Sequence, residues 1–106
     1  MDTFVVQYTI KPGRGDENQA LVEAVFAELA EARPLGVRYE TYRLADGVSF
    51  VHIATITTDD GSNPLTTLPA FVAFTKAIGE RCAVAPALSP ANKVGGYPAA
   101  SATVAS

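Results

Sequence analysis

The chain has 106 residues, 48% hydrophobic and 18% charged, so it has the length of one domain and not of two. Its net charge of −3, with Lys and Arg scattered, lacks the basic patch typical of proteins that bind nucleic acid or anionic membranes. A single cysteine, Cys82, excludes an internal disulfide, and with no secretion signal or membrane-length apolar stretch in view we expect a cytoplasmic protein.

The first predicted element is a strand at residues 3–11, which Pro12-Gly13 ends. Side chains alternate along this segment, as they do in a strand with one buried face. The face expected to be buried carries large apolar residues: Phe4, Val6, Tyr8 and Ile10.

A helix is predicted next, with Asp16 as its N-cap and Gln19 completing a capping-box-like pattern. Pro34 and Gly36 are expected to stop it near Arg33. Between these ends, apolar residues recur at helical spacing and predict a buried stripe: Leu21, Val22, Val25, Phe26 and Leu29.

A β-hairpin follows, because Asp46-Gly47 separates two apolar-rich runs at residues 37–45 and 48–57. Asp-Gly favours a two-residue type I′ turn, in which both central residues have positive φ. This turn pairs residue 45 with residue 48 and therefore sets the whole register. It places Thr41 opposite His52 and Tyr39 opposite Ala54.

The last third of the chain predicts a second helix and a closing strand. The helix is expected to start near residues 67 and 68, with Pro69 in its first turn, and to end near Cys82. Pro86 and Pro90 predict an irregular stretch, so we place the last strand at residues 92–97. Residues 98–106 are small and low in complexity, which indicates a loose tail or an arm laid over a partner.

This order of elements predicts an α+β, ferredoxin-like βαββαβ plait over residues 1–97, an antiparallel four-stranded sheet with both helices on one face. The other face mixes apolar Val5, Tyr42, Leu44, Val51 and Ile53 with polar residues. Because it is too apolar to be left in water, we expect a homodimer formed by sheet-to-sheet packing.

His52, the only histidine, is the candidate catalytic residue, on the helix-facing side of a strand. Two interpretations stay open. It is either a buried histidine hydrogen-bonded to Thr41, Tyr39 or the backbone, or a group that binds a ligand or transfers a proton. The chain has no second histidine, and no cysteine is expected near His52, so no metal site is predicted.

Aromatic residues around His52 allow two further interpretations, plain core packing or the lining of a cavity for a small molecule. In the second interpretation the residues that bind the substrate are Tyr8, Tyr39, Thr41, Phe50, Phe71 and Phe74.

The chain resembles the dimeric α/β-barrel superfamily, and within it the antibiotic-biosynthesis-monooxygenase-like proteins, over about residues 3–97. The resemblance rests on Phe4-Val5-Val6-Gln7-Tyr8-Thr9-Ile10, on residues 46–53, and on Leu68-Pro69-Ala70-Phe71 with Phe74. Val94-Gly95-Gly96-Tyr97 resembles the closing strand of small members.

The resemblance implies two plaits packed sheet to sheet, with a pocket between helices and sheet in each. Relatives include cofactor-independent oxygenases of polycyclic phenols and haem-degrading enzymes, which typically use a tryptophan and an asparagine from a strand or loop. This chain has no tryptophan, and its asparagines are Asn18, Asn63 and Asn92. Haem-degrading members use a histidine on a helix, whereas His52 is expected on a strand.

Two hypotheses of function therefore remain open. The first is a homodimer that binds a small, largely apolar or aromatic molecule and has monooxygenase-like chemistry without a cofactor, with His52 as acid, base or hydrogen-bond donor. The second is a non-enzymatic ligand-binding or interaction module.

Overall fold

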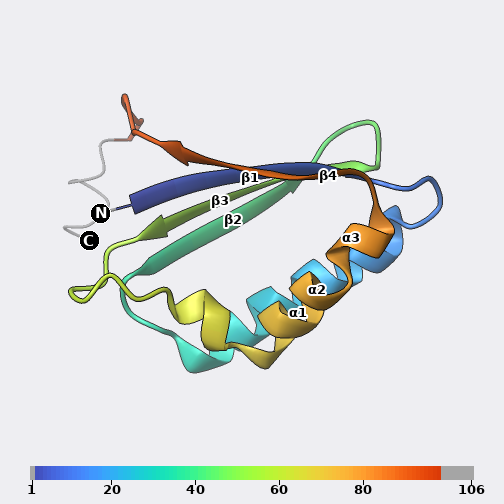
Figure 1. The fold of residues 1–106 in the computed structure, drawn as a ribbon. Helices are drawn as coiled ribbons and strands as arrows, with labels where there is room; N and C mark the ends of the chain where they lie inside the picture. Colours follow the sequence, from blue (N-terminus) through green and yellow to red (C-terminus); the bar gives the residue numbers. More distant parts are fainter. Residues whose placement is uncertain (1, 99–106) are drawn as a thin grey trace.

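The computed structural model describes residues 2–98, which form a four-stranded sheet with helices on one face (Figure 1). Along the chain the elements are β1 (Asp2–Ile10), α1 (Gly15–Ala32), β2 (Val37–Arg43), β3 (Ser49–Ile56), the 3₁₀ helix η1 (Pro64–Thr67), α2 (Pro69–Lys76), α3 (Ile78–Arg81) and β4 (Cys82–Ala91). The sheet order is β2-β3-β1-β4, and every neighbouring pair is antiparallel. The predicted ferredoxin-like plait is confirmed.

The predicted register of the hairpin is also confirmed. Thr41 pairs with His52 and Tyr39 with Ala54, while β3 pairs on its other side with β1. The side chains expected to face the helices do so, since Tyr8, Ile10 and Phe50 belong to the buried core. Alternation along three adjacent strands thus directs one set of side chains into a single layer beneath α1 and α2.

The turn of the hairpin differs from the prediction. The Gly47 N–H donates to the Leu44 carbonyl at 3.0 Å, so Ala45 and Asp46 are the central residues. Only Gly47 has positive φ, +78°. The Asp46 carboxylate accepts from the Val48 and Ser49 N–H groups, which stabilises this wider turn. The type I′ assignment was wrong, although the register it implied is correct.

The predicted N-cap of the first helix was also wrong. The helix begins at Gly15, and its cap position, Arg14, makes no side-chain capping bond. Asp16 and Gln19 instead accept hydrogen bonds from Arg43 at 2.9 and 2.8 Å, which ties the helix to the hairpin. The predicted end is correct, because Arg33 follows the last helical residue in a left-handed conformation with φ +47°.

The second helix starts where expected, with Leu68 as cap and Pro69 as first residue, but it is interrupted at Ala77. The predicted closing strand at residues 92–97 was wrong, because β4 occupies Cys82–Ala91 and residues 92–98 form no strand. Pro86 and Pro90 therefore lie within a strand. β4 is at the edge of the sheet, where a residue without an N–H is tolerated.

The core lies between the sheet and the helices and is built from Tyr8, Ile10, Val22, Val25, Phe50, Leu65, Leu68, Phe74 and Cys82. Among residues 2–98, no helix is long and apolar enough to cross a membrane. Apart from residue 98, the predicted tail lies outside the described residues.

Packing between α1 and the hairpin generates a first prediction. A Cβ at Gly15 would lie 2.5 Å from the Gly47 carbonyl oxygen and would also overlap the Arg43 guanidinium. Gly15→Ala should therefore lower the free energy of unfolding by about 1–3 kcal/mol, the usual cost of overpacking. Urea denaturation would measure it.

The matched control is Gly79→Ala, since nothing lies within 4 Å of a Cβ at that helical position. This substitution should leave the stability unchanged or raise it by up to about 1 kcal/mol. Equal stability of the two variants would contradict the proposed close contact at Gly15.

Candidate functional site

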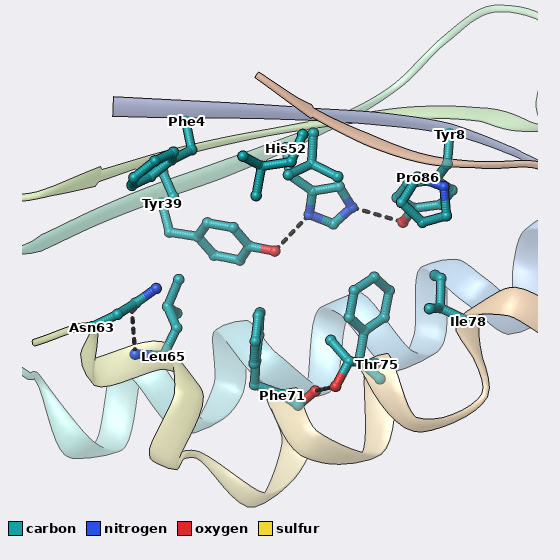
Figure 2. A pocket seen from close by; sticks show the side chains of 14 residues that line it. Phe4, Tyr8, Tyr39, His52, Asn63, Leu65, Phe71, Thr75, Ile78 and Pro86 are labelled. Carbon is teal, nitrogen blue, oxygen red and sulfur yellow. Dashed lines mark hydrogen bonds between the residues drawn. The ribbon is translucent and has the colours of Figure 1, made fainter. Parts of the chain in front are cut away.

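A cavity of about 440 Å³ lies between the sheet and the helical layer. Its walls are mainly apolar, and Figure 2 shows side chains from both layers pointing into it. Three lining residues are exposed, Thr75 on α2 and Pro86 and Leu88 on β4, so the cavity opens between these two elements. The full lining is Phe4, Val6, Tyr8, Tyr39, His52, Ala54, Asn63, Leu65, Phe71, Phe74, Thr75, Ile78, Pro86 and Leu88.

His52 is held in this cavity by hydrogen bonds to both ring nitrogens (Figure 2). The Tyr8 hydroxyl lies 2.7 Å from Nε2, and the Tyr39 hydroxyl lies 2.5 Å from Nδ1. Thr41 lies 3.0 Å from Nδ1. The imidazole is 4% exposed and has aromatic neighbours, with the Phe74 ring centroid 5.4 Å away. Such contacts fix the ring plane and leave it little freedom to turn.

The hydrogen-bond chain continues from Tyr8 into the helical layer. Asn18, on α1 and fully buried, donates from its amide nitrogen to the Tyr8 oxygen at 2.9 Å. The Arg81 guanidinium donates to the Asn18 amide oxygen at 3.2 Å and to the Phe74 carbonyl at 2.8 Å. Four polar side chains, Arg81, Asn18, Tyr8 and His52, thus form a continuous line that reaches Tyr39.

Burial keeps the histidine neutral. Loss of water around the imidazole lowers the pKa of His52 to about 4, so at pH 7 the ring carries no charge. A neutral imidazole has one donor and one acceptor nitrogen. His52 is therefore a weak base, and its role at neutral pH is mainly that of a hydrogen-bonding group.

Both tyrosines are neutral as well. Burial raises the pKa of Tyr39 to about 12, against a smaller opposing effect of the Thr41 hydroxyl. Burial also raises the pKa of Tyr8 well above its usual value, although its hydrogen bond with Asn18 opposes this. At neutral pH each phenol keeps its proton and can donate it.

Asn63 supplies a further polar group at the other end of the cavity. It caps η1, because its side-chain oxygen accepts from the Leu65 N–H at 3.0 Å. That bond fixes the amide orientation and leaves the amide nitrogen as a donor. In Figure 2 this nitrogen points toward the space below Tyr39. The cavity thus presents polar groups at two places on a mainly apolar wall.

The structure brings most of the candidate site residues together. His52, Tyr8, Tyr39, Phe71 and Phe74 all line the cavity. The other two candidates do not. Thr41 contacts His52 from the side, and Phe50 is 1% exposed in the core, with its ring stacked 5.7 Å from that of Tyr8.

Three polar residues near the cavity were not singled out as site residues from the sequence: Asn18, Asn63 and Arg81. Asn18 had a detectable signal, because it lies three, four and seven residues before Leu21, Val22 and Val25 on the apolar stripe. A polar residue at such a position is expected to be buried and hydrogen-bonded. Arg81, at the end of a short helix, had no comparable signal.

No protein-family model matches the chain, and no curated protein matches it. Solved structures do. SnoaB from Streptomyces nogalater, described as a cofactor-independent oxygenase, superposes with a TM-score of 0.67 at 23% identity over 92% of this chain and 96% of its own. The chain has the fold of the antibiotic biosynthesis monooxygenases.

Two further structures with this monooxygenase-like fold are similar. A protein from Nitrosomonas europaea described as a putative antibiotic biosynthesis monooxygenase gives a TM-score of 0.72 at 13% identity, with 92% of each chain covered. One from Caulobacter crescentus gives 0.68 at 21% identity, covering 88% of this chain and 89% of its own. At these identities the likeness concerns the fold.

The lowered pKa of His52 generates a second prediction, on stability. The unfolded chain binds this proton near pH 6.5 and the folded chain only near pH 4, so the unfolded state gains protons first as the pH falls. Folding stability should therefore drop between these two values by up to about 3 kcal/mol on account of His52. Above pH 6.5 and below pH 4 this contribution should not change.

The measurement is urea denaturation at several pH values, compared with His52→Gln. Glutamine keeps a donor and an acceptor but does not titrate, so the difference between the two curves isolates the histidine. Parallel curves between pH 7 and pH 4 would show that His52 is not buried as described.

Proposed function

We propose that the protein binds a small, planar, largely apolar aromatic molecule in the cavity and oxygenates it without a cofactor. The observation that carries the proposal is a mainly apolar cavity of about 440 Å³ with the hydrogen-bonded pair His52 and Tyr39 on one wall. Likeness of fold to SnoaB, described as a cofactor-independent oxygenase, supports the reaction class.

The shape and chemistry of the walls favour a flat aromatic ligand. Phe71 and Phe74 line the helical side of the cavity and Phe4 and Tyr39 line the sheet side. Aromatic faces bind flat apolar molecules by stacking and by removing them from water. A cavity of this size accommodates a molecule of about three fused rings, within the usual range for ligand pockets.

Activation of a ligand such as anthrone needs only a polar group that favours its enolate. Loss of a proton from carbon to water gives an electron-rich anion, which transfers one electron to O₂. The two radicals then join in a carbon–oxygen bond, and the peroxide anion takes a proton back from water. The resulting hydroperoxide loses water to give the quinone, so one O₂ and one anthrone yield one quinone and one water. We assign the Tyr39 hydroxyl to the developing oxyanion, with His52 holding it in place.

The alternative is a non-enzymatic module that binds the same kind of molecule. A specific observation favours it, since burial leaves His52 with a pKa of about 4 and makes it a weak base for removing a proton from carbon. In that case the cavity would bind aromatic molecules without turnover.

The third prediction separates these two functions. Wild-type protein should consume O₂ in the presence of anthrone or a hydroquinone, and Tyr39→Phe should lower kcat on the order of 100-fold, the usual cost of losing one oxyanion donor. The Tyr97→Phe control removes the hydroxyl of a fully exposed tyrosine and should leave the rate unchanged. Oxygen consumption and quinone absorbance measure the rate.

Tight binding of the aromatic panel without oxygen consumption would reject the oxygenase and select the binding module. A rate that Tyr39→Phe and His52→Gln leave intact would remove both residues from the mechanism.

We further propose that the protein is a homodimer packed through the sheet face opposite the helices. In Figure 1 no helix covers that face. It carries the half-buried Val5, Val51 and Ile53 and the exposed Tyr42, an apolar set that a second copy of the chain would cover.

A fourth prediction tests this dimer by sedimentation. Wild-type protein should sediment as a dimer at micromolar concentration, and Ile53→Arg should shift it toward the monomer, because a charge would be buried at the interface. Leu35→Arg is the control, since Leu35 is 89% exposed in the connection after α1. A wild-type monomer would refute the proposal.

A further inference from the structure

A buried arginine without a carboxylate partner lies at the end of the hydrogen-bond chain. Arg81 is 2% exposed, and neither of the ion pairs found in residues 2–98 includes it. Its guanidinium lies 5.5 Å from the Phe74 ring centroid and donates to the Phe74 carbonyl and to Asn18. Arginine has donors and no acceptor and stays protonated in proteins, so the direction of these hydrogen bonds is fixed.

The donor and acceptor atoms of each side chain fix the direction of the next hydrogen bond, from Arg81 to His52. Because Arg81 donates to the Asn18 oxygen, the Asn18 amide nitrogen faces Tyr8 and donates to it. The Tyr8 oxygen accepts this bond, which leaves the Tyr8 proton for the His52 Nε2 at 2.7 Å. A ring nitrogen that accepts a hydrogen bond carries no proton, so the neutral His52 is protonated at Nδ1.

The position of the His52 proton determines whether the Tyr39 hydroxyl can donate a hydrogen bond to a ligand in the cavity. Nδ1 lies closer to the Tyr39 oxygen, at 2.5 Å, than to Thr41, at 3.0 Å. If Nδ1–H donates to Tyr39, the Tyr39 hydroxyl proton is directed away from the histidine and is free for a ligand. With the opposite tautomer, Tyr39 would donate to Nδ1 and would offer the cavity only a lone pair.

We propose that Arg81, acting through Asn18 and Tyr8, is a positioning residue that holds His52 in its Nδ1–H form and makes Tyr39 a hydrogen-bond donor to the ligand. The ligand class is then a flat aromatic molecule that bears an acceptor oxygen, a carbonyl or a phenolate. The inference rests on the proposed function only for the aromatic nature of the ligand.

The tautomer can be observed directly, because His52 is the only histidine of the chain. In protein labelled with ¹⁵N-histidine, NMR at neutral pH distinguishes a protonated from an unprotonated ring nitrogen. Wild-type protein should show a protonated Nδ1 and an unprotonated Nε2. A dominant Nε2–H form would overturn the proposal.

Asn18→Asp tests the transmission from Arg81. A carboxylate only accepts, so Tyr8 would have to donate to it and accept from His52, which reverses the tautomer. We expect the ratio of Nδ1–H to Nε2–H to fall by at least about tenfold, which corresponds to roughly 1.4 kcal/mol. The new carboxylate would pair with Arg81, so the buried charges compensate each other and the fold should be retained.

Asn92→Asp makes the same chemical change at an exposed residue after β4 and should leave the His52 signals as in the wild type. A purely structural role of Asn18 predicts a loss of stability in Asn18→Asp without a change of tautomer. An unchanged Nδ1–H form in that variant would therefore refute the transmission.

Ligand preference provides a second readout that does not depend on turnover. Xanthone, a flat tricyclic ketone that lacks the oxidisable carbon of anthrone, should bind wild-type protein at least about tenfold more tightly than anthracene, consistent with one added buried hydrogen bond. Asn18→Asp should abolish this preference. Equal binding of the two molecules by wild-type protein would overturn the donor assignment, whereas failure of anthrone turnover alone would reject only the oxygenase.

Discussion

The antiparallel pairing of β3 with its two neighbours decides where every polar group of the site lies. In this register His52 pairs with Val6 on one side and with Thr41 on the other. Tyr8 and Tyr39 lie two residues further along their strands, on the same face and diagonal to His52, within reach of long side chains. A slip of β3 by one residue would turn His52 toward the opposite face, away from Tyr8 and Tyr39, and the cavity would lose the histidine of its polar wall.

The helical layer buries this arrangement of polar groups. Phe74 packs against His52 and Tyr8, and its backbone carbonyl accepts from Arg81, so one residue of α2 contributes both apolar cover and a polar contact. Polar groups removed from water are costly unless their hydrogen bonds are made. Here the described residues leave no buried side-chain nitrogen or oxygen without a partner. The same helical layer therefore supplies the apolar surroundings of His52 and completes the hydrogen bonds of the buried polar groups.

Local patterns predicted the fold well because the period of a strand and the position of a hairpin turn are encoded in neighbouring residues. The predicted register was correct although the predicted turn type was wrong, because residue 43 pairs with residue 50 in both turn types. The closing strand was misplaced since Pro86 and Pro90 argue against a central strand, and the sequence does not reveal that β4 lies at an edge.

The candidate site was predictable only in part. The hairpin register pairs His52 with Thr41, and strand alternation then places Tyr39, two residues from Thr41, on the same face. The apolar alternation of residues 3–11 places Tyr8 on that face as well. Arg81 and Asn18 are 63 positions apart. Their contact depends on where the junction of α3 and β4, which carries Arg81, lies relative to α1, which carries Asn18. No local pattern encodes such a junction, which explains why the far end of the hydrogen-bond chain was missed.

The prolines of β4 have a consequence for assembly. An edge strand exposes unpaired backbone groups on which a strand of another molecule can align, and this is a common route to aggregation. Pro86 and Pro90 have no backbone N–H, so the β4 edge has two fewer hydrogen-bond donors. Continuation of the sheet from β4 into a second molecule is therefore disfavoured. Such growth of the sheet beyond β4 is unfavourable, whereas stacking of two sheet faces about a two-fold axis ends with a closed pair.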